Sequence, residues 1–276
     1  MLNTYSPIFM NTPANLGKSL STRAGVGTAI CISQQVTTHC RRLSVNDPAV
    51  AVVFRGRKII RLTEGEIIVN EGSAVVMPAG FEADIVNEVA EDGHYRALCF
   101  CFAQELLPLR NLDERGSLTR TTLLPDVQPG FIAAIDAAID ATGDTTLPHS
   151  IVAHRANELQ LWLASHDIIL ASPSKDDLVG AIKRHIAADL AKDWPAVEIS
   201  SAMGMSEATL RRKLAKVGHS LSEILSDSRM SAAPVMLQST GDSITQIAFA
   251  VGYESPSRFA TRFRKRFGFV PSVLRK

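Results

Sequence analysis

The sequence predicts an α+β chain of two domains, in which an antiparallel β domain with a pair of helices precedes an all-helical domain. Short runs rich in β-branched residues, separated by glycine-containing turns, fill residues 25–102. Helical periodicity replaces this pattern from residue 129 onward.

Charge divides the chain in the same way. Residues 1–177 carry 14 Lys and Arg against 20 Asp and Glu, whereas residues 178–276 carry 15 against 8. The overall net charge of +1 therefore hides an acidic front and a basic back, which indicates a nucleic acid or another polyanion as the partner of the back half.

The front half contains strands at close and regular spacing. We expect strands at residues 49–54, 58–62 and 66–69, and a closing strand at residues 95–102. Such spacing is typical of an antiparallel barrel or sandwich.

Two helices are expected to follow the strands. The first covers residues 129–141, with Pro129 near its start and Gly143 just past its end, and the second covers about residues 150–170. A polar segment at residues 172–177 has the composition of a linker. We therefore expect domains at residues 1–172 and 178–276.

Composition excludes several classes of protein. Hydrophobic residues make up 46% and charged residues 21% of the chain, which is ordinary for a globular protein. No run of about 18 uncharged apolar residues occurs, so we expect no contact with a membrane. The four cysteines are too few and too scattered for a disulfide framework, so we expect a cytoplasmic protein with reduced thiols.

The last hundred residues contain two segments of the same design. In the first, a short helix is expected to end at Met203, Gly204 supplies a tight turn and Ser206 caps a second helix. Leu210 and Leu214 face inward on that second helix, because residues four apart share one face. This is the pattern of a helix-turn-helix, whose second helix can enter the major groove of DNA.

The second segment begins about fifty residues later and repeats this arrangement. Ser243 and Gln246 form a capping box, Gly252 is the turn residue, and Ser255 followed by Pro256 starts the second helix. A stripe of phenylalanines faces inward on that helix and basic residues cover its remainder. Two such segments, each with a basic second helix, favour DNA binding over a generic helical hairpin.

Residues 178–276 resemble the DNA-binding domain of the AraC/XylS family of bacterial transcription regulators. The positions that carry the resemblance include Ile247, Ala248, Gly252, Tyr253, Phe259, Phe263, Gly268 and Pro271 in the second segment, and Gly204, Ser206, Leu210, Gly218 and Ser220 in the first. The resemblance implies a sequence-specific activator of transcription. Its expected partners are double-stranded promoter DNA and RNA polymerase.

Three residues depart from the family pattern. Pro234 lies inside the helix that joins the two segments, where it is expected to kink or shorten that helix. Ser200 stands where the family usually has alanine, and Thr261 stands where several relatives have an arginine that reads bases.

The resemblance also implies which residues contact DNA. The residues expected to face bases are Ala208, Arg211, Arg212, Ser257, Arg258 and Thr261. The residues expected to contact phosphates are Ser206, Thr209, Ser255, Arg262 and Lys265.

The front domain resembles the cupin-like barrel that serves as the sensor and dimerisation domain in this family. The match rests on the layout and on residues 72–80. A small-molecule or protein effector is expected there. Four cations in or between strands are candidates for binding an anionic ligand, and the alternative is a solvated cationic hairpin; they are Arg55, Arg57, Lys58 and Arg61.

A small-molecule cupin enzyme with a helical appendage is the alternative function. It would require metal ligands or a paired nucleophile and base, but His39 and His94 stand alone and no His-x-His pair occurs. We therefore expect no enzymatic activity, no metal and no cofactor.

The second predicted helix also suggests self-association. Its apolar residues Leu159, Trp162 and Leu163 are expected to form an interface for a homodimer or a weak monomer–dimer equilibrium. The alternative is that both helices pack wholly on their own β domain.

Overall fold

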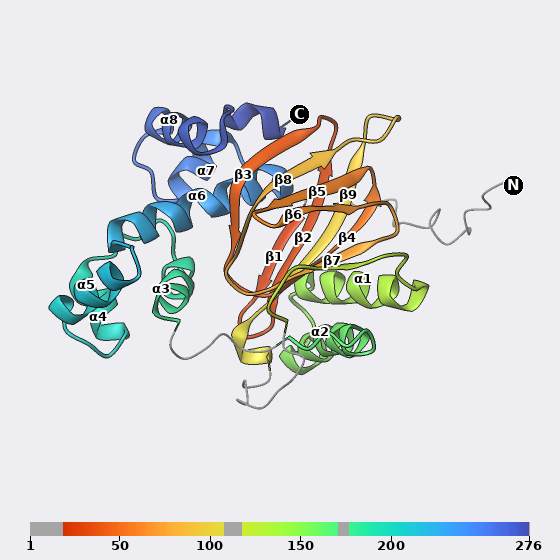
Figure 1. Ribbon diagram of the computed structural model, residues 1–276, viewed down its shortest axis with the longest axis horizontal. Helices are drawn as coiled ribbons and strands as arrows, with labels where there is room; N and C mark the ends of the chain where they lie inside the picture. Colours follow the sequence, from red (N-terminus) through yellow and green to blue (C-terminus); the bar gives the residue numbers. More distant parts are fainter. Residues whose placement is uncertain (1–18, 108–117, 171–176, 276) are drawn as a thin grey trace, which may run out of the picture.

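The computed structural model describes residues 19–107, 118–170 and 177–275, and it confirms the predicted two-domain α+β fold (Figure 1). The N-terminal domain contains two antiparallel sheets. The larger has the spatial order β1 (Ser19–Arg23), β2 (Gly27–Gln34), β9 (Tyr95–Phe102), β4 (Ala49–Arg55), β7 (Ala74–Met77) and β10 (Thr122–Leu124). The smaller has the order β3 (Thr38–Val45), β8 (Phe81–Glu88), β5 (Arg57–Leu62) and β6 (Gly65–Val69).

The two sheets form a sandwich, one of the two arrangements that the strand spacing predicts, and not the barrel that the cupin-like resemblance implies. Within the described residues β1 and β10 form the edges of one sheet, and β3 and β6 form the edges of the other. A closed barrel requires every strand to have two hydrogen-bonded neighbours. The cupin-like resemblance therefore holds for the antiparallel strands and not for closure.

Both faces of the larger sheet are buried. Ala49, Ala51 and Val53 of β4 face the smaller sheet, whereas Val50 and Val52 face the helices α1 and α2. All five side chains are at most 2% exposed. Burial on both faces explains why this strand reads as a continuous apolar run and does not alternate.

Helices α1 (Pro129–Gly143) and α2 (His149–Ala164) cover the outer face of the larger sheet (Figure 1). The second helix ends at Ala164, earlier than expected, because the chain turns sharply there. Asp167 adopts a φ of +59°, and the amide of Ile168 donates to the carbonyl oxygen of Leu163 over 3.1 Å. This is a common way for a helix to end.

The expected dimer interface on α2 needs correction. Leu159 and Leu163 are 0% exposed, because they pack in the core between α2, α1 and the larger sheet. Trp162 is partly buried, and its ring lies against Gly130 of α1. The large apolar residues that α2 exposes are Ile151, at 45%, and Leu161, at 71%.

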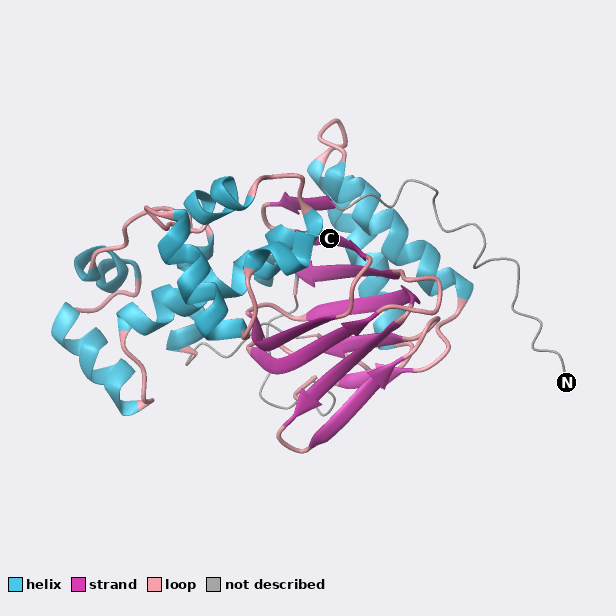
Figure 2. Cartoon of the chain, turned by 90° about the horizontal axis from the view of Figure 1, so that it is seen from above, coloured by secondary structure: helices cyan, strands magenta, loops and turns pink. Residues whose placement is uncertain are grey.

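The C-terminal domain is helical and gathers at one end of the β domain (Figure 2). Its helices are α3 (Leu178–Ala187), α4 (Ala196–Ala202), α5 (Glu207–Lys216), α6 (Leu221–Ser239), α7 (Ile244–Ala250) and α8 (Pro256–Phe267), followed by the short 3₁₀ helix η3 (Pro271–Arg275). The linker expected at residues 172–177 lies almost wholly outside the described residues, so the exact domain boundaries stay predictions.

Helix α6 joins the two predicted hairpins and runs past Pro234, which does not shorten it as expected. A capping box between Ser220 and Glu223 closes its start. Ala233 and Leu237, on either side of the proline, are 0% exposed. Burial of these neighbours offsets the backbone hydrogen bond that proline cannot make.

The corrected position of Leu159 gives a first prediction. Leu159→Ala should lower the free energy of unfolding by about 2–5 kcal/mol, because the truncation leaves a cavity in the core. Leu161→Ala, two residues along on the exposed side, should change it by less than about 0.5 kcal/mol. Urea denaturation of both variants measures the difference, and equal effects would contradict the burial of Leu159.

Candidate nucleic-acid interface

The first helical hairpin is built as the sequence predicts. Gly204 turns the chain between α4 and α5 with a φ of +66°, a conformation that side chains with a Cβ disfavour. The hydroxyl of Ser206 accepts from the amide of Thr209 over 3.3 Å and caps α5. Leu210 and Leu214 are buried, which fixes the opposite face of α5 toward solvent.

Ser200 fits the buried side of this hairpin despite its polar group. Its side chain is 3% exposed, and its hydroxyl donates to the carbonyl oxygen of Val197 over 3.0 Å. A helix carbonyl thus satisfies the hydroxyl that the family's alanine lacks.

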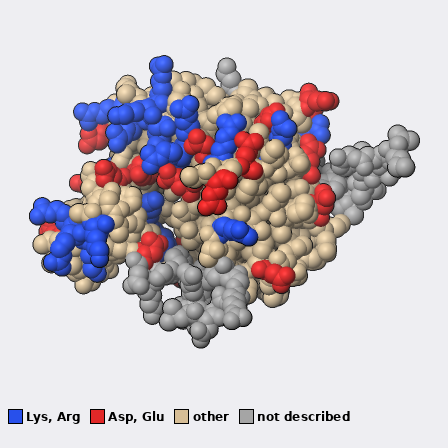
Figure 3. Space-filling model, in the orientation of Figure 1, with Lys and Arg blue, Asp and Glu red and all other residues tan. Residues whose placement is uncertain are grey.

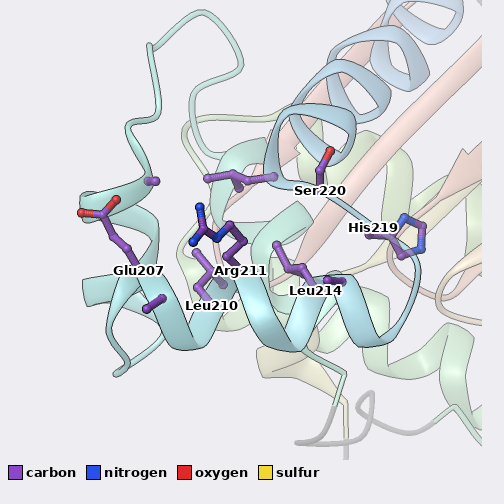
Figure 4. A pocket seen from close by; sticks show the side chains of 10 residues that line it. Glu207, Leu210, Arg211, Leu214, His219 and Ser220 are labelled. Carbon is purple, nitrogen blue, oxygen red and sulfur yellow. The ribbon is translucent and has the colours of Figure 1, made fainter.

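The three residues of α5 that were expected to face bases are all exposed: Ala208, Arg211 and Arg212. Arg211 lies along one side of the helix, where it lines a cavity of about 400 Å³ together with His219 and Ser220 from the loop that leads into α6 (Figure 4). Since residues along a helix are 100° apart, Arg212 points away from the leucines instead. The two arginines therefore lie on different sides of α5.

The second hairpin repeats the design with an aromatic core. Ser243 and Gln246 form the predicted capping box, and the hydroxyl of Ser255 caps α8. Phe259, Phe263 and Phe267 are at most 1% exposed, and neighbouring rings in this stripe lie 5.6 and 4.5 Å apart between centroids. Aromatic packing of this kind holds α8 firmly on α6 and α7.

Gly252, between α7 and α8, is required by packing as well as by backbone conformation. Its φ is +80°, and a Cβ at this position would lie 2.5 Å from the carbonyl oxygen of Leu190. The guanidinium group of Arg229 fills the remaining space, where it donates to the carbonyl oxygens of Leu190 and Lys192. The joining helix is thereby tied to the loop before α4.

The three α8 residues that were expected to face bases are also exposed: Ser257, Arg258 and Thr261. Among those expected to contact phosphates, Lys265 is exposed and has no ion pair within the described residues. Arg262 donates to the hydroxyl of Ser226 on α6 over 2.9 Å. Lys and Arg side chains gather over α8 and again over α5, as two separate patches on the face shown in Figure 3.

The four cations proposed for an effector do not converge on one site. Arg55, Arg57 and Arg61 lie at the surface and pair with Asp92, Glu88 and Glu66 at 2.8, 2.7 and 2.9 Å. These contacts favour the solvated cationic hairpin for the three arginines.

Lys58 differs from the three arginines, because it points between the two sheets. Its side chain is 5% exposed, and its amine donates to the amide oxygen of Asn87 over 2.7 Å. Asn87 in turn contacts Gln34, and no carboxylate pairs with the amine among the described residues. Burial lowers the pKa of Lys58 to about 8, since the low-dielectric interior disfavours the charged form. The hydroxyl of Tyr95 is also buried close by, and among the described residues it has no hydrogen-bond partner.

In the described ranges no three His, Cys, Asp or Glu side chains gather as metal ligands would. None of the helices there combines the length and apolar character that crossing a membrane requires.

Comparison with known proteins identifies the helical region. Residues 199–276 match the family described as a helix-turn-helix domain. The chain is similar to the transcriptional activator PerA of Escherichia coli O127:H6, with 31% identity over 38% of each chain. It is also similar to the transcriptional regulator SirC of Salmonella typhimurium, with 36% identity over 31% of this chain and 29% of SirC. The chain thus spans less than two fifths of these relatives. The predicted resemblance is confirmed: residues 199–276 form a helix-turn-helix domain of the AraC type.

The whole fold has a counterpart among solved structures. ToxT from Vibrio cholerae, in a crystal structure with an unsaturated fatty acid bound, superposes with a TM-score of 0.61. The alignment covers 91% of this chain and 95% of ToxT at 13% identity, so it establishes the shared two-domain fold and no more.

The buried amine of Lys58 gives a second prediction. The pKa of Lys58 is lowered from 10.5 to about 8 in the folded protein. Folding is therefore less favourable at every pH at which the buried amine is charged. That cost is fully present below pH 8 and disappears as the pH rises to 10.5, and it amounts to about 3 kcal/mol. Lys58→Met removes it. The free energy of unfolding of Lys58→Met minus that of the wild type should therefore decrease as the pH rises from 7 to 10. Arg57→Met, a change of an exposed neighbour, should show no such trend.

Proposed function

We propose that this protein is a sequence-specific DNA-binding transcription regulator that acts as an activator. The observation that carries the proposal is the pair of capped hairpins, each of which presents an exposed second helix with unburied cations. Helices of this kind read base edges in the major groove while cations at their margins contact phosphates. PerA is named as a transcriptional activator, which supports activation of transcription over repression. RNA polymerase is then the second partner, since an activator acts on it.

An effector that acts through the N-terminal domain is the finer part of this proposal. The fatty acid bound to ToxT supports a small molecule as the effector, because the two proteins share a fold. Lys58 supports this proposal, because its side chain is buried and its amine lacks a counter-ion among the described residues. An anionic group that entered the β domain would supply this counter-ion.

Self-association through α2 is also part of the proposal, with a revised set of residues. Leu161 and Ile151 are large apolar side chains left in solvent on this helix. A homodimer or a weak monomer–dimer equilibrium would cover them and would match paired promoter sites.

Genome-wide mapping of bound DNA, combined with transcript changes in a deletion strain, tests the function directly. We expect bound promoters whose transcripts fall when the gene is deleted. Absence of discrete bound sites would contradict the proposal.

The residues that contact DNA give a third prediction. Arg258→Ala should weaken binding to the preferred site by about 1–3 kcal/mol per base read and should relax the preference at that base. Lys265→Ala should weaken binding to preferred and scrambled DNA alike, and it should reduce the salt dependence of log Kd by about one phosphate contact. Fluorescence anisotropy on both duplexes over a range of salt concentrations separates the two classes of effect. Identical profiles for both variants would show that the roles are assigned wrongly.

The dimer surface gives a fourth prediction. Leu161→Glu should shift sedimentation toward the monomer and should reduce activation at promoters with two sites, because a buried glutamate would lack a partner. The protein should remain folded, since this residue is 71% exposed. A wild-type protein that is strictly monomeric at high concentration and on DNA would refute dimerisation through this helix.

A further inference from the structure

Arg266, in the last turn of α8, is committed to contacts inside the protein. Its guanidinium group donates to the carboxylate of Asp227 on α6 over 2.5 Å and to the backbone carbonyl oxygen of Arg42 on β3 over 3.0 Å. The side chain is only 10% exposed, whereas the neighbouring Arg264 and Lys265 are exposed. Arg266 therefore links three elements from two domains, and it is not available for a phosphate.

The strand that receives this contact is irregular at that point. Between Cys40 and Leu43 the pairing of β3 with β8 shifts its register, so that two residues lie opposite Asp84 alone. Arg42 adopts a φ of +51° there, and its amide donates to the carboxylate of Asp84 over 2.7 Å. A bulge of this kind redirects backbone groups out of the sheet. Here it offers the carbonyl oxygen of Arg42 to α8.

Cys40, just before the bulge, adds a hydrophobic contact between β3 and α8. It is 5% exposed and belongs to the hydrophobic cluster that contains Phe263 and Phe267 of α8. Burial raises the pKa of its thiol to about 12, as expected for a thiol within an apolar contact. A residue of the β domain thus completes the core of the second hairpin.

The described residues of the first hairpin's core make no equivalent contact. Its hydrophobic cluster, which runs from Ile182 to Ile224, contains no residue of the N-terminal domain in the part of the chain that the structure describes. Where α3 faces the β domain there is a cavity of about 620 Å³, whose lining includes the charged residues Asp47, Glu105 and Arg184. Among the described residues, the β domain therefore contributes to the hydrophobic core of the second hairpin and not to that of the first.

We propose that Arg266 is a positioning residue that fixes reading helix α8 to strand β3, so that the second hairpin and the β domain move as one body. The consequence for DNA rests on the proposed function: a change in β3 alters where α8 lies relative to α5, and with it the spacing of the two half-sites that the protein accepts. The bulge at Arg42 would then determine how far the DNA segment that α8 contacts lies from the segment that α5 contacts.

The first test needs no DNA, because Cys40 reports on the contact. In a background with Cys31→Ala, Cys99→Ala and Cys101→Ala, the rate at which a thiol reagent labels Cys40 in the full chain measures how often α8 leaves β3. Arg266→Leu should raise this rate at least about tenfold under native conditions. Arg264→Leu, the same change at an exposed position two residues away, should leave it unchanged. Equal rates in the two variants would overturn the proposal.

A conservative variant covers the case in which Arg266→Leu does not fold. Arg266→Lys keeps the charge beside Asp227, but a single ammonium group cannot reproduce the fork that reaches both acceptors. Labelling of Cys40 should be faster in Arg266→Lys than in wild type while circular dichroism stays unchanged. Labelling at the wild-type rate would show that the contact with Arg42 does not hold α8.

The second test addresses the half-sites. On a duplex selected by the wild-type protein, inserting one base pair between the half-sites should weaken wild-type binding by at least about tenfold, because the insertion rotates one site relative to the other. Arg266→Lys should lose less than about threefold. An equal loss in both proteins would overturn the link to half-site spacing. If the wild type selects no duplex at all, the proposed function fails, while the labelling result still decides whether Arg266 holds α8 to β3.

Discussion

Burial of helix α6 on three sides is the constraint on which the arrangement of this protein depends. Near its start Ile224 enters the core of the first hairpin, and farther along Met230, Ala233 and Leu237 form the core of the second. Val235, on a third side, packs against the core between the two sheets. A helix that contributes to three cores at once has little freedom to rotate about its own axis, so α5, α8 and the β domain are all arranged around it.

Much of the C-terminal domain could be predicted from the sequence because its signals are local. Caps such as Ser206 and Ser255, the turn residue Gly252 and the spacing of the phenylalanines each act within one or two turns of chain. The family resemblance then supplied the outward-facing positions, which the structure leaves exposed. Propensity, capping and periodicity agree with one another in this domain, which is why reasoning from the sequence was accurate.

The errors arose where distant segments decide the outcome. Whether two sheets close into a barrel depends on the pairing of their edge strands, which no single strand encodes. The apolar residues of α2 were assigned to a surface because periodicity shows that a stripe exists but not what covers it. Leu159 and Leu163 turned out to face α1 and the sheet. The sequence does not distinguish Arg266 from its basic neighbours Arg264 and Lys265, although its position next to Phe267 indicates a partly buried side chain.

The thiol of Cys40 within the second hairpin's core also bears on how such chains diverge. The core of the second hairpin includes a side chain from the β domain. Recombination cannot freely exchange this hairpin between proteins, because a new N-terminal domain would have to supply a small apolar residue and a bulge at the same place. The seam between the two domains should therefore be inherited as a unit. The core of the first hairpin contains no residue of the front domain within the described ranges, so this hairpin can vary independently of that domain.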